Sequence, residues 1–357
     1  MQHSKPNITM HEMTAVMNAV NNGHLADGVL NAEFEGLFTA MYGYPHVVSL
    51  NSGTSAMHLA LLAMGVGPGD EVIVTPYTMV ATVNVILAVG ATPVFADIER
   101  DTYNLSADCV AQKVTNKTKA VMPVDLFGVP ADILAIRNVI PDHVKILEDS
   151  IEALGSVYQG KPVGTHADAG AFGFYPNKQI TTCEGGILYS KDKDLIDKVR
   201  RLSRHGVMTG DLSYQSMGYN MRLSDLHAAL GIAQLQRFHD MQKRLDEVAA
   251  DLDAYFLDLR KQATRPGDKG THFIYSIELP KHVNKEEFIR VMGADYQIPV
   301  KPYFNVLHTL KHLQPYASPC PVAEEVGART VALPFHSGIT QQNILHIVES
   351  FGRYVYD

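Results

Sequence analysis

Cysteine is scarce in this chain, and the residues that usually build metal sites are scattered. The three cysteines, Cys109, Cys183 and Cys320, are far apart and form no CxxC pair. This spacing argues against a disulfide framework and against a zinc cluster, and it predicts a reducing, cytoplasmic environment. The 16 histidines form neither an HxH nor an HExxH motif, so we expect surface or core histidines and no metal site.

The chain also lacks an excess of positive charge and a long apolar run. It carries 30 Lys and Arg against 38 Asp and Glu, a net charge of −8, so no overall basic field attracts nucleic acid. The most apolar stretch, residues 80–96, is interrupted by polar residues, a glycine and a proline and is too broken to span a bilayer. Residues 1–7 contain no apolar core of a signal peptide. We therefore expect neither nucleic acid nor a membrane as a partner.

Short apolar runs alternate with helical segments between about residues 45 and 205. One helix is predicted from Thr54 to Met64, because its apolar residues recur at helical spacing and Gly65 stops it. Near-continuous apolar strands with helices between them are typical of a mainly parallel α/β sheet covered on both faces. Strands are predicted at residues 47–49, 71–75, 93–95, 120–122, 144–147, 170–174 and 186–189.

The rest of the 357 residues predicts a second, smaller domain. A long helical stretch, broken once, begins after Ser224, which is a suitable N-cap. A strand at residues 272–279 and helices at 285–292 and 340–351 then predict a small α+β unit. We expect a large domain over residues 1–240 and a small domain over 241–357, with the helical first forty residues packed against the small domain.

Lys178 and Asp149 carry the chemical hypothesis. Each follows a predicted strand, and ligands of parallel sheets bind at the carboxyl ends of the strands. An enzyme that uses pyridoxal phosphate (PLP) needs one lysine to form a Schiff base and one carboxylate to keep the pyridine nitrogen protonated. Taken singly, the aspartate could be a helix cap and the lysine a solvated surface residue.

A phosphate turn strengthens this hypothesis. Asn51–Ala56 lies between a strand and a helix start, where Gly53 permits close backbone approach and the amides and hydroxyls of Thr54 and Ser55 favour a dianion. Alone, this segment could be a turn with good capping residues, and Gly185–Gly186 could be a tight turn. The order of phosphate turn, aspartate, lysine and Gly-Gly strand is that of fold-type I PLP enzymes.

Several motifs make the chain similar to the DegT/DnrJ/StrS-type sugar aminotransferases over nearly its whole length. The resemblance implies an aspartate aminotransferase-like fold, with a mainly parallel seven-stranded sheet in the large domain and a small C-terminal α+β domain. The motifs that carry it are residues 28–35, 51–60, 67–74, 78–84, 148–155, 177–186, 204–206, 218–222 and 333–340.

The resemblance implies roles for individual residues. Lys178 matches the Schiff-base lysine and Asp149 the partner of the pyridine nitrogen, while Thr54 and Ser55 match the phosphate-binding pair. Asn220 matches a residue that reaches the phosphate of the neighbouring subunit's cofactor. The family's arrangement is therefore a homodimer with shared active sites.

Three positions depart from the family pattern. The family commonly has a phosphate-binding serine five residues before the lysine, where this chain has Gly173, so that contact is lost or replaced by water. The position of the usual stacking aromatic holds Met79, with Tyr77 close by. Glu152 stands where many members have glutamine or histidine near the phenolic oxygen, so we expect it to be protonated, turned away or used on the substrate side. Members similar to GDP-perosamine synthase also carry glutamate there.

The resemblance also bears on the reaction. Related sugar 3-dehydratases replace the lysine with histidine, so Lys178 favours transamination. The expected substrates are L-glutamate as amino donor and a nucleotide-linked 4-keto- or 3-keto-6-deoxy sugar. A keto-cyclitol or other antibiotic precursor remains an alternative substrate, and a non-catalytic PLP-fold regulator remains an alternative function. Substrate contacts are expected from Tyr77 and Glu152 and from loops at 207–216 and 304–308, the latter including His308.

Overall fold

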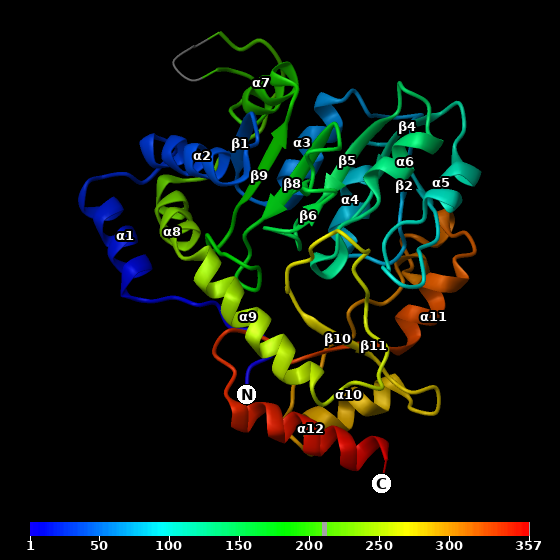
Figure 1. The fold of residues 1–357 in the computed structure, drawn as a ribbon. Helices are drawn as coiled ribbons and strands as arrows, with labels where there is room; N and C mark the ends of the chain where they lie inside the picture. The colour runs from blue at the N-terminus through cyan, green and yellow to red at the C-terminus, as the bar shows by residue number, and fades with distance from the viewer. Residues whose placement is uncertain (209–212, 357) are drawn as a thin grey trace.

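The computed structural model describes residues 1–208 and 213–356, and its centre is a seven-stranded sheet in the order β1-β9-β8-β5-β4-β2-β3 (Figure 1). Strand β9 is antiparallel to both of its neighbours, while the pairs from β8 to β3 are parallel. The strands of this sheet are β1 (His46–Leu50), β2 (Glu71–Val74), β3 (Thr92–Phe95), β4 (Thr118–Met122), β5 (Lys145–Asp149), β8 (Ala169–Gly173) and β9 (Gly186–Ser190). Every strand predicted between residues 45 and 205 is confirmed, with ends that differ by at most two residues.

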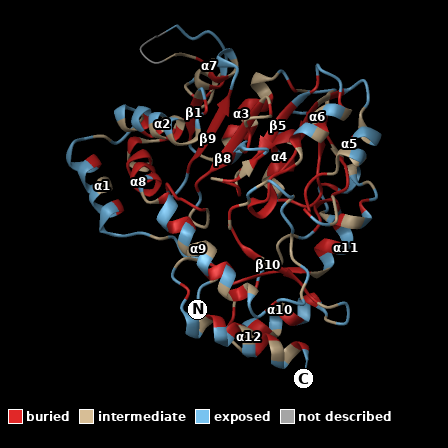
Figure 2. Ribbon diagram, viewed as in Figure 1, coloured by how far each residue is buried: buried red, intermediate tan, exposed pale blue. Residues whose placement is uncertain are grey.

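Helices cover both faces of this sheet, as its apolar strands require. Two separate apolar cores result, one beneath α3, α4 and α7 and the other beneath α2, α5, α6 and α8. Burial is concentrated in the central strands, and the outer faces of the helices are exposed (Figure 2). The helices of this part are α1 (Met10–Asn21), α2 (Val29–Tyr42), α3 (Gly53–Ala63), α4 (Val80–Ala88), α5 (Ala107–Lys113), α6 (Ile133–Val139), α7 (Lys193–Leu202) and α8 (Asp225–Gln236).

The C-terminal part builds a third apolar core below the sheet (Figure 1). Its two strands pair antiparallel, and β10 is shorter than the strand predicted at 272–279. The predicted long helix breaks at Arg237, between α8 and α9, and Ser224 caps it as expected by accepting from the His227 amide. The elements are α9 (Phe238–Asp253), β10 (Tyr275–Glu278), α10 (Lys285–Ala294), α11 (Pro321–Arg329), β11 (Thr330–Leu333) and α12 (Gln341–Val355); a separate hairpin pairs β6 (Val157–Tyr158) with β7 (Lys161–Pro162).

One expectation about packing was wrong. The N-terminal helices α1 and α2 do not pack against the C-terminal core; both pack on α8, and α2 also contacts β1. The reason is the burial of α8, which is apolar and buried around most of its circumference and therefore needs cover on more than one side. Within the first forty residues, it is the extended segment before α1 that contacts the C-terminal part, where the Phe335 amide donates to the His3 carbonyl.

Candidate active site

A cavity of ≈ 330 Å³ opens at the carboxyl ends of the parallel strands. Its floor contains Asp149 at the end of β5 and the start of α3, and Lys178 lies in the turn that follows β8. This is where ligands of parallel α/β sheets bind. The lining residues are Ser52, Gly53, Thr54, Met57, Thr78, Met79, Ala81, Thr82, Val124, Asp149, Ile151, Glu152, Gly173, Phe174, Tyr175, Asn177, Lys178, Glu184, Gly185, Phe273, Tyr303 and Phe304.

Lys178 is presented by a closed loop. The Lys178 amide donates to the Tyr175 carbonyl at 2.9 Å, and the loop is closed where the Phe174 amide donates to the Gly185 carbonyl at 2.9 Å. The side chain is 12% exposed, with its Nζ 3.2 Å from Glu152 Oε1 and 4.0 Å from the centroid of the Phe273 ring. Carboxylate and aromatic face both attract the ammonium group, so this amine is held in the cavity.

Asp149 is buried and held from two sides. Thr82 Oγ1 donates to its Oδ2 at 2.7 Å, and the Ile151 amide donates to its Oδ1 at 3.2 Å. Burial is the main cause that raises the pKa of Asp149 to about 6, against the lowering effect of these two hydrogen bonds. At pH 7 the group is therefore mostly a carboxylate, and a cation in the cavity would stabilise that form further.

The first turn of α3 forms a narrow cradle. Ser52 caps the helix by accepting from the Ser55 amide at 3.0 Å, which leaves the Gly53 and Thr54 amides without an acceptor among the described residues. Side chains are excluded here, since a Cβ on Gly53 would lie 2.6 Å from Ile151 Cδ1 and a Cβ on Gly186 would lie 2.5 Å from the Gly53 nitrogen. Two free amides at a helix start are suited to an anion such as phosphate.

These residues fit PLP. Lys178 supplies the amine, Asp149 a buried carboxylate, and the glycine cradle a phosphate site, all in one cavity. Six of the residues predicted to bind the cofactor line this cavity: Gly53, Thr54, Met79, Asp149, Glu152 and Lys178. The Ser55 hydroxyl instead lies 2.9 Å from that of Ser52, and Ser55 does not line the cavity.

The three unusual positions have distinct surroundings. Ile151 fills the space above Gly173, where a Cβ would lie 3.0 Å from Ile151 Cγ2. Met79 is 53% exposed at the cavity rim. Glu152 is not turned away from the site: its Oε1 pairs with Lys178, and its Oε2 accepts from the Phe127 amide at 3.1 Å.

Three further residues lie away from the cavity within this chain. Tyr77 is fully buried and donates its hydroxyl hydrogen to the Tyr303 carbonyl at 2.8 Å. His308 is buried beside Phe95 and lies 3.2 Å from Glu324. Asn220 is exposed and lies outside the cavity, and its backbone forms an isolated antiparallel β-bridge with Arg204. The 207–216 loop includes residues 209–212, which lie outside the described part of the chain.

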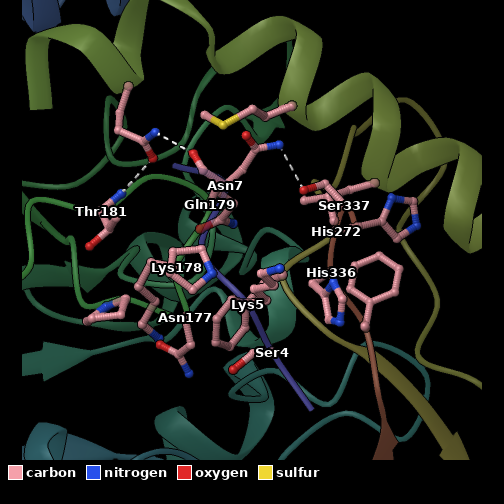
Figure 3. A pocket seen from close by; sticks show the side chains of 17 residues that line it. Ser4, Lys5, Asn7, Asn177, Lys178, Gln179, Thr181, His272, His336 and Ser337 are labelled. Atoms are coloured by element: carbon pink, nitrogen blue, oxygen red, sulfur yellow. Dashed lines mark hydrogen bonds between the residues drawn. The ribbon is translucent and has the colours of Figure 1, made fainter. Parts of the chain in front are cut away.

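Sequence reasoning missed Phe273 and Tyr303 on the cavity wall, whereas Phe304 belongs to the 304–308 loop from which substrate contacts were expected. Phe273, Tyr303 and Phe304 come from the chain after residue 270 and reach the cavity only through the tertiary fold. Thr82 was also missed, although Thr78, which precedes α4, and Thr82 in its first turn are four residues apart and have their hydroxyls 3.3 Å from each other. A second cavity of ≈ 40 Å³ adjoins Lys178 and Asn177, lined in part by residues 4–7 (Figure 3).

The described residues contain neither a membrane-spanning helix nor a cluster of metal-binding side chains. No helix in residues 1–208 and 213–356 is long and apolar enough to cross a membrane. In the same residues, no group of three or more His, Cys, Asp and Glu side chains could hold a metal ion.

Comparison with known proteins adds the family. Residues 6–352 match the DegT/DnrJ/EryC1/StrS aminotransferase family. Among curated relatives, the chain is 35% identical to the spore coat polysaccharide biosynthesis protein SpsC of Bacillus subtilis, covering 98% of this chain and 95% of the relative. It is 33% identical to GDP-perosamine synthase of Escherichia coli O157:H7, covering 99% of this chain and 98% of the relative.

Solved structures show the same fold and the cofactor. A Streptococcus pneumoniae protein assigned as a sugar aminotransferase, in its PLP form, superposes with a TM-score of 0.93 at 28% identity, over 100% of both chains. The Helicobacter pylori aminotransferase PseC, involved in pseudoaminic acid biosynthesis, gives 0.91 at 27% identity, over 99% of this chain and 98% of that chain. The chain therefore belongs to the DegT/DnrJ/EryC1/StrS family and is a PLP-dependent sugar aminotransferase.

Proposed function

We propose that this enzyme moves an amino group from L-glutamate to a nucleotide-linked 4-keto- or 3-keto-6-deoxy sugar in the cytoplasm. The observation that carries the proposal is the shared cavity of Lys178, Asp149 and the α3 cradle. Relatives whose names include GDP-perosamine synthase support a sugar nucleotide as substrate.

The protein's own groups divide the work. When bound, PLP supplies an electron-accepting ring and a carbon that carries the amino group between the two substrates. Asp149 holds a proton at the pyridine nitrogen, and Thr82 orients the Asp149 carboxylate. The free peptide N–H groups of Gly53 and Thr54 would hold the phosphate at the helix start.

Lys178 is the proposed proton carrier. Lys178 would hold the cofactor through its amine; when that amine is free, it would take up the proton that leaves the α-carbon of the amino donor and release it again. Its position 3.2 Å from Glu152 and 4.0 Å from the Phe273 ring keeps it near the reacting atoms between these transfers. Phe273 and Phe304 reduce the access of water to this amine.

We also propose a homodimer in which Asn220 reaches the phosphate site of a second copy of the chain. The exposure of Asn220, its distance from the cavity of its own chain and the family resemblance support this arrangement. Analytical ultracentrifugation tests it. A monomer that binds PLP and is fully active would contradict it.

A substrate panel tests the proposed reaction. The purified enzyme should absorb in the visible, and it should form 2-oxoglutarate from L-glutamate with one or more nucleotide-linked keto sugars. Lys178→Ala should abolish turnover, while Lys281→Ala, a change at an exposed lysine, should not. Failure of the wild type to bind PLP would refute the central claim.

The same panel separates the alternatives. Turnover of an inosose but of no keto sugar would favour the keto-cyclitol reading. Bound PLP without turnover of any keto substrate would favour a regulatory role. Glutamine or alanine replacing glutamate as the better donor would correct the donor alone.

A further inference from the structure

Tyr303 lines the cavity that also contains the α3 cradle. It lines the same cavity as Lys178, and the Asn177 Nδ2 lies 3.4 Å from its hydroxyl, a long hydrogen bond. Its ring is half-buried, so one part of it is available to a bound molecule. An aromatic ring with a polar tip matches a sugar ring, which has apolar C–H faces and hydroxyl edges.

A hydrogen bond fixes the backbone of Tyr303, and separate contacts with neighbouring rings set the position of its own ring. The Tyr77 hydroxyl donates to the Tyr303 carbonyl at 2.8 Å, which anchors the main chain. Phe127 meets the ring edge-on, with centroids 6.2 Å apart at 72°. Phe304, the next residue in the chain, tilts against the ring at 4.8 Å and 52°. His3 provides the stacked contact, with its imidazole at 5.9 Å and an interplanar angle of 13°.

His3 is itself held firmly. Its Nδ1 lies 2.8 Å from the Pro299 carbonyl, which can only accept, so Nδ1 carries the hydrogen. Its own carbonyl accepts from the Phe335 amide at 2.9 Å. Bonds to two segments of the C-terminal part therefore fix the His3 backbone and orient its imidazole against Tyr303.

The segment that carries His3 is tied down at a second point. Asn7 accepts from Arg237 at 2.8 Å and donates to Ser337 at 3.0 Å, which links α8–α9 to the C-terminal part. Figure 3 shows Ser4, Lys5 and Asn7 of this segment beside Lys178, Asn177 and His336. A fixed segment, and not a free end, thus presents the imidazole to the active-site wall.

We propose that Tyr303 forms part of the keto-sugar binding wall and that His3 is a positioning residue that fixes the Tyr303 ring in that place. The inference rests on the proposed function, because it concerns the acceptor side of the same reaction. His3 does not line the larger cavity, so its effect passes through Tyr303.

Removal of the imidazole should change acceptor binding and leave the donor step in place. In His3→Ala the lost ring contact should raise the KM for the keto sugar by about three- to tenfold, which is the range of one aromatic pair. The single-turnover reaction of the PLP form with L-glutamate, followed by the loss of the visible band, should keep its rate. Tyr303→Ala should raise the same KM at least as much.

Two conservative variants separate ring stacking from the hydrogen bond. His3→Phe keeps a flat ring but loses the donor to Pro299, and its KM should fall between those of the wild type and His3→Ala. His3→Asn keeps a short donor but loses the ring, and it should behave like His3→Ala. Every variant retains the main-chain bond to Phe335, and thermal denaturation of the holoenzymes checks that each one folds.

Each outcome decides the matter. An active wild type with an unchanged KM in both His3→Ala and His3→Asn would overturn the inference alone. A raised KM in His3→Phe equal to that of His3→Ala would overturn the stacking role. A wild type that binds PLP but aminates no keto sugar would overturn the proposed function, and the inference with it.

Discussion

A serine at position 173 is a direct test of where the phosphate binds. Related enzymes commonly carry a phosphate-binding serine five residues before the lysine, and this chain has Gly173 with Ile151 packed above it. The Cβ of Gly173→Ser would lie 3.0 Å from Ile151 Cγ2 and 3.4 Å from Ile151 Cγ1. The new hydroxyl can therefore reach the phosphate only if Ile151 gives way.

The gain from a new hydrogen bond to the phosphate and the cost of overlap with Ile151 are of similar size. A hydrogen bond to a charged phosphate contributes about 1.5–3 kcal/mol. Overpacking against a well-packed neighbour costs about 1–3 kcal/mol. Gly173→Ser alone should therefore change PLP affinity little. Gly173→Ser with Ile151→Ala removes the overlap and should bind PLP about tenfold more tightly than Ile151→Ala, which is about 1.4 kcal/mol.

PLP titration of the apoenzyme, followed by the visible band, measures these affinities. The matched control is Gly173→Ser with Ile151→Val, because valine keeps the Cγ1 and Cγ2 atoms that meet the serine and loses only Cδ1. This control should show no gain over Ile151→Val. Thermal denaturation checks the cost of Ile151→Ala, about 2–5 kcal/mol for a well-buried isoleucine and less here. Equal PLP affinity in Ile151→Ala with and without the serine would refute the placement of the phosphate.

Three further predictions concern charged groups. Asp149→Asn should lower kcat/KM by at least about 100-fold. In the wild type, the affinity for PLP should decrease as the pH drops below 6, because Asp149, with its raised pKa of about 6, becomes protonated in that range. The Asp149→Asn variant should lose this pH dependence. Glu152→Gln removes the charge beside Lys178, so the KM for the keto sugar should rise, and unchanged spectra and rates would exclude a substrate role. Glu278→Gln breaks the buried pair with Arg100 and should lower the free energy of unfolding by about 3 kcal/mol in urea titrations; no change would contradict this.

The central sheet was predictable because its strands are buried on both faces. Strands β2 and β4 each end in three consecutive apolar residues, Val72–Val74 and Ala120–Met122, a pattern typical of a strand buried on both faces. The packing of α1 and α2 was not predictable from their own residues. It depends on α8, whose burial on most sides is a property of the assembled fold.

The positions of Asp149 and Lys178 were predictable from the order of the strands. Asp149 and Lys178 follow strands β5 and β8, which are neighbours in the sheet, so their proximity follows from topology. Tyr303 and Phe273 face them from a different part of the chain. Their place depends on how the C-terminal core sits against the sheet, and local sequence carries no signal for that contact.

Tyr77 shows how a residue can matter to a site without lining it. It follows β2, beside the cavity residue Thr78, which made it a reasonable substrate candidate. Its side chain points into the protein and holds the Tyr303 carbonyl. Its effect on substrate is therefore expected to pass through the Tyr303 loop.

Glu152 must change partners during the reaction, and this change favours a role on the substrate side. Its Oε1 pairs with Lys178 at 3.2 Å, while its Oε2 keeps the Phe127 amide as a donor. In the enzyme with PLP bonded to Lys178, Nζ would carry at most one hydrogen and would be a poorer donor to Oε1. A buried carboxylate oxygen with too few donors is costly, so Oε1 would need another donor in that state. A hydroxyl or ammonium group on the incoming substrate supplies the missing donor, so we infer that Glu152 selects substrates that carry one at this point.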